Sequence, residues 1–272
     1  MSEADAHEAA ARAALDAAVE HAYATFAGYK PGREQVSVCR CGQCIQPESE
    51  FVLLNAPLRD IDHYPLADYT YAANREGEPG FDPNELRYFL PRMLDLVAQE
   101  NPPCFSEPEP TLRRLRECKY RETWPAAEVA AVDDFYSALM AERLSAPTRV
   151  WTTRNGDLPS SEDVGDILCM IVIGGGDLAR LLGEWDANPD QRATHHLAAQ
   201  ILGLKLSEDC GTGFSTAFWS NDTDARDAFH DWLLRPQAVA KLERAMVTER
   251  DPRMRDWLAE ARDFVTAVSP LG

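Results

Sequence analysis

No stretch of this sequence is apolar for long enough to cross a membrane. The longest uninterrupted apolar run covers only residues 167–173, whereas a membrane-spanning helix needs about 18 or more. Residues 1–7 also lack the basic and apolar segments of a secretory signal. Lysine is scarce, with 4 Lys against 23 Arg, a bias that is common in GC-rich genomes and excludes no chemistry. We therefore expect a cytoplasmic protein without a membrane partner.

The cysteines do not follow the spacing of a disulfide framework. Their number, seven, is odd, and Cys118 and Cys169 lie in apolar, helix-like surroundings. Free thiols of this kind are typical of a reducing compartment rather than of a secreted scaffold. The cysteine content therefore agrees with a cytoplasmic location.

Positive charge is in deficit along the whole chain. The net charge is −18, from 45 acidic and 27 basic residues, and residues 1–150 alone carry 25 acids against 15 bases. A uniformly acidic surface repels nucleic acid and anionic membranes, so neither is expected as a partner. The same surface favours a cationic protein partner, or it serves solubility alone.

Helical patterns dominate what is present. The clearest helix start is Asp82 followed by Pro83, because Asp caps a first turn and Pro presets φ at the first helical position. Apolar residues then recur at helical spacing as far as Val97. Similar patterns predict helices at 2–27, 47–54, 65–75, 83–97, 110–118, 125–144, 161–173, 176–186, 189–204, 222–234, 236–248 and 251–268. No clear period-two strand pattern separates those beyond residue 160.

Short connections between these helices predict an all-α fold of stacked antiparallel helical hairpins, either α-solenoid-like or an irregular helical bundle. The segment 145–160 is rich in turn formers, and we expect it to be a linker. It would join an N-terminal helical subdomain, 1–144, to a C-terminal helical subdomain, 161–272, packed together as one unit. The N-terminal subdomain includes a cysteine-rich loop at 36–48.

The only compact group of chemically special side chains is Cys39, Cys41 and Cys44, in the pattern C-x-C-x-x-C. Thiolates at this spacing can bind Zn²⁺ on one face of a tetrahedral site. A structural zinc site needs a fourth ligand, which the sequence does not identify; His63 is one candidate. The alternatives are a redox pair of Cys41 and Cys44, or three ordinary reduced thiols. A redox C-x-x-C normally opens a helix in a βαβ unit, and that context is missing.

Two further groups of residues are better explained by structure than by chemistry. The glycines at 174–176 follow an apolar run, but the phosphate-binding pattern is absent and Asp177 would repel phosphate. We interpret them as the end of one helix and the cap of the next. His195 and His196 are adjacent on a predicted helix, so their side chains point about 100° apart and cannot chelate one ion. No catalytic residue is assigned.

Four stretches occur in a characteristic order. They are FLPR and a following leucine-rich turn at 89–96, W-P-x-x-E with a later Phe at 124–135, Phe-Trp at 218–219, and W-L-L-R-P followed by Leu-Glu at 232–243. In this order they resemble a widespread family of uncharacterised bacterial proteins, over most of residues 36–245. The resemblance implies packed helices. No activity is established for that family, so it implies no catalytic residues.

The leading hypothesis is a non-enzymatic protein-interaction protein. Its concrete form is an acidic immunity or antitoxin-type inhibitor of a cationic partner, because complementary charge speeds association. The alternative is a zinc-binding domain or a metal-dependent enzyme centred on Cys39, Cys41 and Cys44, since catalytic zinc keeps three protein ligands and one open position. The nearest carboxylates, Glu48 and Glu50, are not obviously placed as a general base, so an enzyme is the less favoured interpretation.

Overall fold

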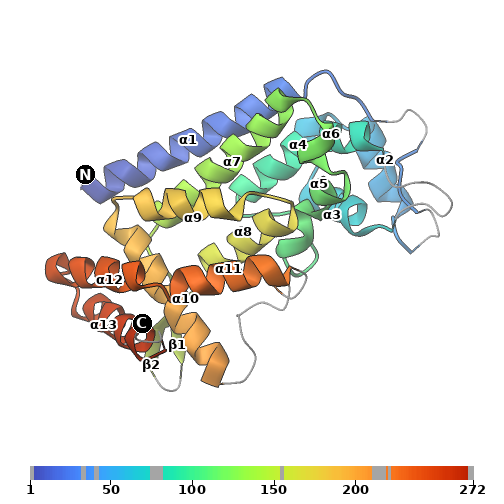
Figure 1. The fold of residues 1–272 in the computed structure, drawn as a ribbon. Coiled ribbons are helices and arrows are strands. Elements are labelled where there is room, and N and C mark those ends of the chain that lie inside the picture. The colour runs from blue at the N-terminus through green and yellow to red at the C-terminus, as the bar shows by residue number, and fades with distance from the viewer. Residues whose placement is uncertain are drawn as a thin grey trace. The chain divides into compact units, whose positions relative to one another are not determined.

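In the residues that it describes, the computed structural model of the protein consists of helices and one small β-hairpin (Figure 1). It describes residues 3–31, 35–39, 43–73, 82–153, 156–209, 219 and 222–268. The helices are α1 (Glu3–Thr25), α2 (Pro47–Asn55), α3 (His63–Tyr71), α4 (Pro83–Ala98), α5 (Arg113–Glu117), α6 (Tyr120–Thr123), α7 (Ala126–Ser145), α8 (Glu162–Ile173), α9 (Leu178–Ala187), α10 (Gln191–Asp209), α11 (Thr223–Leu233), α12 (Pro236–Thr248) and α13 (Pro252–Val268). One-turn 3-10 helices, η1 (Leu58–Asp60) and η2 (Glu109–Leu112), connect them. The predicted all-α fold is confirmed, in the form of an irregular helical bundle.

Aspartate caps begin several of the helices. Asp82 accepts a hydrogen bond from Asn84 N at 2.9 Å, as its position before Pro83 predicts. Asp177 and Asp222 cap α9 and α11 in the same way. Each cap satisfies one of the backbone N–H groups that the first turn of a helix leaves without a partner. Local sequence therefore sets where these helices start.

The chain divides into two compact units that are discontinuous in sequence. Unit 1 comprises Met1–Ala11, Met140–Val172 and Asp177–Gly272, and unit 2 comprises Arg12–Leu139 and Ile173–Gly176. The sequence predicted two contiguous subdomains instead. The difference arises because α1 and α7 are 23 and 20 residues long, and a helix of that length rises about 30 Å, enough to contribute to both units.

A β-hairpin occupies the segment predicted to be a linker, 145–160. Its strands β1 (Val150–Thr153) and β2 (Gly156–Pro159) pair antiparallel, with Val150 opposite Pro159. The pairing continues one step further, because Ser160 N donates to Arg149 O at 2.8 Å. Four-residue strands are too short to show a clear alternation of apolar and polar residues, so their sequence resembles turns.

Unit 2 buries an arginine at the end of α3. Arg114 is almost fully buried, and its guanidinium donates to Tyr69 O at 2.6 Å, to Ala72 O at 2.8 Å and to Thr70 O at 3.3 Å. The last carbonyls of a helix have no partner within the helix, so a cation placed there satisfies them. Around this point α3 packs against α2, α4 and η2.

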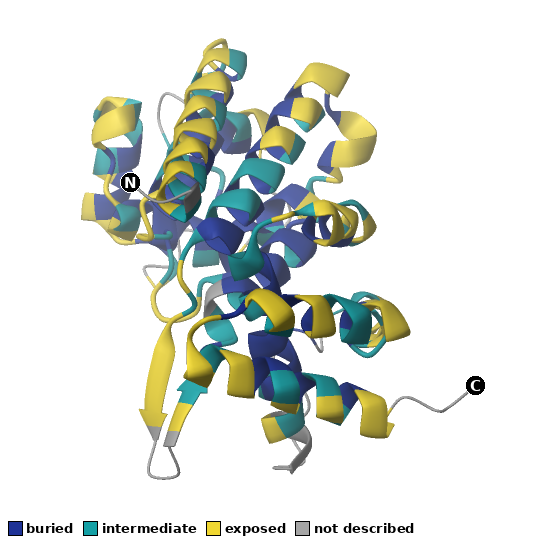
Figure 2. Cartoon of the chain, turned by 90° about the vertical axis from the view of Figure 1, so that its left-hand side faces the viewer, coloured by how far each residue is buried: buried dark blue, intermediate teal, exposed yellow. Residues whose placement is uncertain are grey.

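Unit 1 is organised around α10. This helix packs against α11, α12 and α13, and α12 also packs against α13. Trp185 at the end of α9 is fully buried, and its indole N–H donates to Ala193 O of α10 at 2.9 Å. Helices in the structure show buried stripes alternating with exposed stripes (Figure 2). One face of each helix supplies the core, as amphipathic helices do.

Two glycines in unit 1 allow a matched test of this packing. A Cβ atom at Gly203 in α10 would lie 2.5 Å from Ser161 Oγ and 2.8 Å from Ser161 Cβ, whereas one at Gly183 in α9 would meet nothing within 4 Å. We expect Gly203→Ala to lower the free energy of unfolding by about 1–3 kcal/mol through overpacking. Gly183→Ala should raise it by roughly 1 kcal/mol, because Ala is the better helix former. Urea unfolding of both variants measures the difference, and a stabilising Gly203→Ala would contradict the packing of α10 on Ser161.

Candidate functional site

The two described cysteines of the cluster, Cys39 and Cys44, are partly buried in unit 2; Cys41 lies outside the described residues. Cys39 N donates to Ala73 O at 2.8 Å, just beyond the end of α3. At the other end of the segment, Gln46 N donates to Asp68 Oδ2 of α3 at 3.4 Å. Both ends of the cysteine segment are therefore held against the same helix.

Buried carboxylates anchor the residues that precede Cys39. Val36 N donates to Glu50 Oε1 of α2 at 3.2 Å, and Ser37 donates to Glu85 of α4 through its backbone N–H at 3.0 Å and its hydroxyl at 2.7 Å. Burial raises the pKa of Glu85, although the hydrogen bonds from Ser37 favour its ionised form. The chain thus approaches the cysteines along a path held by α2 and α4.

The described residues do not test the predicted zinc site, because Cys41 is not among them. In the part of the chain that the structure describes, no three His, Cys, Asp or Glu side chains are grouped to hold a metal ion, and Cys41 is not in that part. The suggested fourth ligand, His63, has its Nδ1 at 3.0 Å from Asp62 Oδ1. The site of Cys39, Cys41 and Cys44 stays a prediction.

The glycine run is a helix boundary, as interpreted from the sequence. Helix α8 ends at Ile173, and Gly175 has a φ of +86°, which a side chain would disfavour. Asp177 then caps α9 by accepting from Arg180 N at 3.0 Å. In unit 2 the carbonyl of Gly175 accepts from Arg121 Nε at 2.6 Å. These contacts are those of a helix boundary, as predicted.

The side chains of the adjacent histidines contact different residues, as their positions on a helix predict. His195 Nε2 lies 2.6 Å from Glu249 Oε2, and His196 Nε2 donates to Ala146 O at 3.0 Å. Burial opposes ionisation of Glu249, but hydrogen bonds from Asp251 N and from His195 outweigh it and lower its pKa. Sequence reasoning missed Glu249, because it is remote in sequence from its partners on α10.

An exposed aromatic group on unit 2 was also missed. Tyr64 and Phe105 are 51% and 53% exposed, and their ring centroids lie 5.8 Å apart. Tyr71 lies two turns after Tyr64 on α3, and its ring is 5.2 Å from that of Phe105. Phe105 therefore contacts two tyrosines on one face of the helix. The i, i+7 spacing of the tyrosines was the available signal; nothing local marks Phe105.

Carboxylates lie beside these rings in sequence, and the charge of Glu107 also acts on Tyr71 in space. Asp62 caps α3 two residues before Tyr64, and the backbone and imidazole N–H groups of His63 lower the pKa of its exposed carboxyl group. The exposed residue Glu107 follows Phe105, and its carbonyl accepts from Tyr71 Oη at 2.8 Å. We call these five residues, Asp62, Tyr64, Tyr71, Phe105 and Glu107, the aromatic–acidic surface.

One cation already lies on this surface. The guanidinium of Arg113 lies 5.7 Å from the ring centroid of Tyr71, and Arg113 also donates to Thr70 O at 3.0 Å. Burial raises the pKa of Tyr71 to about 12, and the negative charges of Glu109 and Glu107 add to the shift. Tyr71 is therefore a neutral ring partner for a cation at neutral pH, and the exposed rings of Tyr64 and Phe105 are its neighbours.

Comparisons with known proteins assign no function to the chain. No protein-family model, curated protein or solved structure gives a significant match. Among the described residues, no helix has both the length and the hydrophobicity that crossing a membrane requires. The function is therefore argued from the geometry above.

Stability at mildly acidic pH should depend on His196. Its side chain is 1% exposed, and burial lowers its pKa from 6.5 to about 4. Between these values the unfolded chain binds a proton that the folded chain excludes, so the free energy of unfolding falls as pH falls, by up to about 1.4 kcal/mol per pH unit. Urea unfolding between pH 7 and pH 4.5 should show this slope, and His196→Gln should flatten it. An unchanged slope in the variant would assign the proton to another group.

Proposed function

We propose that the protein binds a cationic protein partner through the aromatic–acidic surface of unit 2. The observation that carries the proposal is the contact between Tyr64 and Phe105, two half-exposed aromatic rings, on a chain with a net charge of −18. Exposed apolar side chains normally occur singly, and a group of them marks an interaction site. Aromatic residues are enriched in the energetic centres of protein interfaces.

The chemistry of the surface suits arginine or lysine side chains of the partner. A cation over the face of a tyrosine or phenylalanine is attracted by the ring, and Arg113 over Tyr71 is an example within the chain itself. The carboxylates of Asp62 and Glu107 can pair with the same cations. The negative net charge raises the rate of encounter with a basic protein. An acidic inhibitor of a basic protein is one concrete form of this function.

Contacts within unit 2 hold the side chains of this surface in place before any partner binds. Phe105 contacts α3 through two rings, and the hydrogen bond from Tyr71 to Glu107 O ties its loop to that helix. Buried Arg114 in turn closes the end of α3. Side chains held in place before binding lose less conformational entropy when the complex forms.

A zinc-stabilised loop is the second candidate. It rests on the hydrogen bonds of Cys39 and Gln46, which hold both ends of the cysteine segment against α3 and its end. With both ends anchored there, three thiolates at C-x-C-x-x-C spacing can surround one ion. Zinc at Cys39, Cys41 and Cys44 would stabilise this part of unit 2, and the fourth ligand is unassigned.

Phe105→Ala tests the proposed binding surface. The probe is a tetra-arginine peptide, titrated into isotope-labelled protein at low salt and followed by NMR chemical shifts. We expect Phe105→Ala to weaken binding about two- to fivefold, since a cation–ring contact contributes roughly 0.5–1 kcal/mol at an exposed site. The substitution leaves the net charge unchanged, so any loss comes from the ring and not from general attraction to an acidic protein.

The matched control is Phe51→Ala. Phe51 in α2 is 67% exposed and lies outside the aromatic–acidic surface, so its removal should leave the affinity unchanged. Equal affinity for wild type, Phe105→Ala and Phe51→Ala would show only non-specific attraction and would reject the surface. Glu107→Gln should reduce the affinity and its dependence on salt.

Metal content tests the second candidate. Protein purified without added zinc or a metal affinity column should contain about one zinc per chain if the site forms, and a Cys41→Ser/Cys44→Ser variant should contain none. Cys104→Ser is the control, because Cys104 is a partly buried thiol outside the cluster. A folded wild-type protein that neither contains zinc nor takes it up from solution would reject the candidate.

A further inference from the structure

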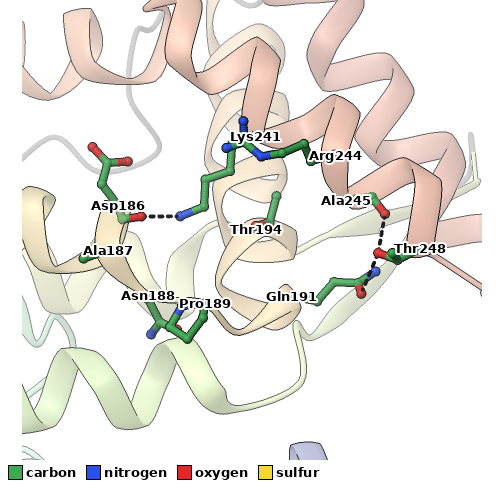
Figure 3. A pocket seen from close by; sticks show the side chains of 10 residues that line it. All are labelled: Asp186, Ala187, Asn188, Pro189, Gln191, Thr194, Lys241, Arg244, Ala245 and Thr248. Carbon is green, nitrogen blue, oxygen red and sulfur yellow. Dashed lines mark hydrogen bonds between the residues drawn. The ribbon is translucent and has the colours of Figure 1, made fainter.

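Unit 1 contains a cavity of about 340 Å³ where three helices meet (Figure 3). Its lining comes from the end of α9, the start of α10 and the second half of α12. The lining residues are Asp186, Ala187, Asn188, Pro189, Gln191, Thr194, Lys241, Arg244, Ala245 and Thr248. Small-molecule sites span about 300–1,000 Å³, so this volume suits a small metabolite and not a dinucleotide.

Lysine, the scarcest charged residue of the chain, supplies one wall of the cavity. Lys241 Nζ donates to Trp185 O at 2.9 Å and to Asp186 O at 3.3 Å, two carbonyls of the last turn of α9. An ammonium group has three N–H donors, so one remains after these two bonds. Burial lowers the pKa of Lys241, and the carboxylate of Asp186 opposes that shift.

Arg244 provides a second cation in the same wall. It lies one turn after Lys241 on α12, so both side chains project from one face of that helix. The positive charge of Arg244 contributes to the lowered pKa of Lys241, so the two cations lie within electrostatic range of each other. Arg244 is exposed and forms no ion pair with any residue that the structure describes. Its five N–H donors are therefore available to a ligand.

Asp186 is the one acidic residue in the lining, and its carboxylate is hydrogen-bonded to residues outside the cavity. Asp186 accepts hydrogen bonds from Arg235 and from Trp232 Nε1, the latter at 3.2 Å. Figure 3 shows the carboxylate turned away from the Lys241 amine, which contacts the backbone of Asp186 instead. The carboxylate of Asp186 is thus hydrogen-bonded to Arg235 and Trp232, although its charge still opposes the lowered pKa of Lys241.

Neutral polar groups also line the cavity. Thr248 Oγ1 lies 3.2 Å from both Gln191 Oε1 and Ala245 O, and Gln191 Nε2 donates to the buried Glu249 at 2.7 Å. These bonds fix the side chain of Gln191 between Thr248 and Glu249. A ligand beside Arg244 would meet the second N–H of the oriented Gln191 amide, because the single hydroxyl hydrogen of Thr248 is already donated.

We infer that this cavity binds a small oxyanion, a phosphate or carboxylate group of a small molecule, between Arg244 and Lys241. A guanidinium forms two parallel hydrogen bonds to either group, and a lysine ammonium adds a point charge. The remaining N–H of Lys241 and the second N–H of Gln191 Nε2, which the bond to Glu249 does not use, complete the contacts. The site belongs to unit 1 and shares no residue with the aromatic–acidic surface, so the two proposals stand independently.

Arg244→Ala tests the site, because Arg244 is exposed and its loss should not affect folding. Inorganic phosphate and acetate are titrated separately into wild-type protein, with binding followed by calorimetry and by the NMR shifts of Thr194 and Thr248. We expect at least one of the two anions to bind, and Arg244→Ala to weaken that binding by about tenfold. Preference between the two anions identifies the head group.

Arg226→Ala is the charge-matched control. Arg226 lies on α11 and pairs with its neighbour Asp227, outside the cavity, so its loss should leave the affinity unchanged. Arg244→Lys should restore part of the affinity, because it keeps the charge but not the paired donors. No binding of either anion at millimolar concentration, or equal loss in Arg244→Ala and Arg226→Ala, would overturn the inference.

Discussion

The buried guanidinium of Arg114 lets α3 end inside unit 2. Its donors fill the carbonyls at the end of α3, so this helix can end inside the core without leaving acceptors unsatisfied. The same helix carries Tyr64 and Tyr71 on its exposed face, and it receives both ends of the cysteine segment. Both candidate sites of unit 2 thus rely on one polar group that water does not reach.

Buried carboxylates also accept hydrogen bonds from backbone N–H groups at two irregular places in the chain. Glu50 and Glu85 accept backbone N–H groups of residues 35–39, and Glu249 accepts those of Arg250 and Asp251 in the turn between α12 and α13. A buried charge is costly unless it is hydrogen-bonded, and in these positions the backbone supplies the donors. Part of the acidic excess is therefore structural, and the surface charge available to a partner is smaller than the net charge suggests.

Sequence reasoning succeeded where the cause was local. The start of α4 at Pro83, the boundary at Gly175 and the divergent His195 and His196 all follow from capping, φ preferences and helical periodicity. The sequence did not predict contacts between segments that are far apart along the chain. Lys241 contacts the end of α9 across 55 residues, and no spacing rule anticipates such a contact.

The same limit applies to the candidate sites. The cysteine cluster was visible because its members are neighbours in the sequence. The aromatic–acidic surface depends on Phe105 in a loop meeting α3, and the cavity depends on three helices meeting. Both arise from packing, so only the structure brings their residues together.

The discontinuity of the two units has a consequence for the history of the gene. The chain passes between units after residues 11, 139, 172 and 176, and the first two passages fall within α1 and α7. Neither unit corresponds to one uninterrupted stretch of coding sequence. A recombination event with a single junction could therefore not have added or removed a complete unit. The two units are therefore expected to have been inherited together.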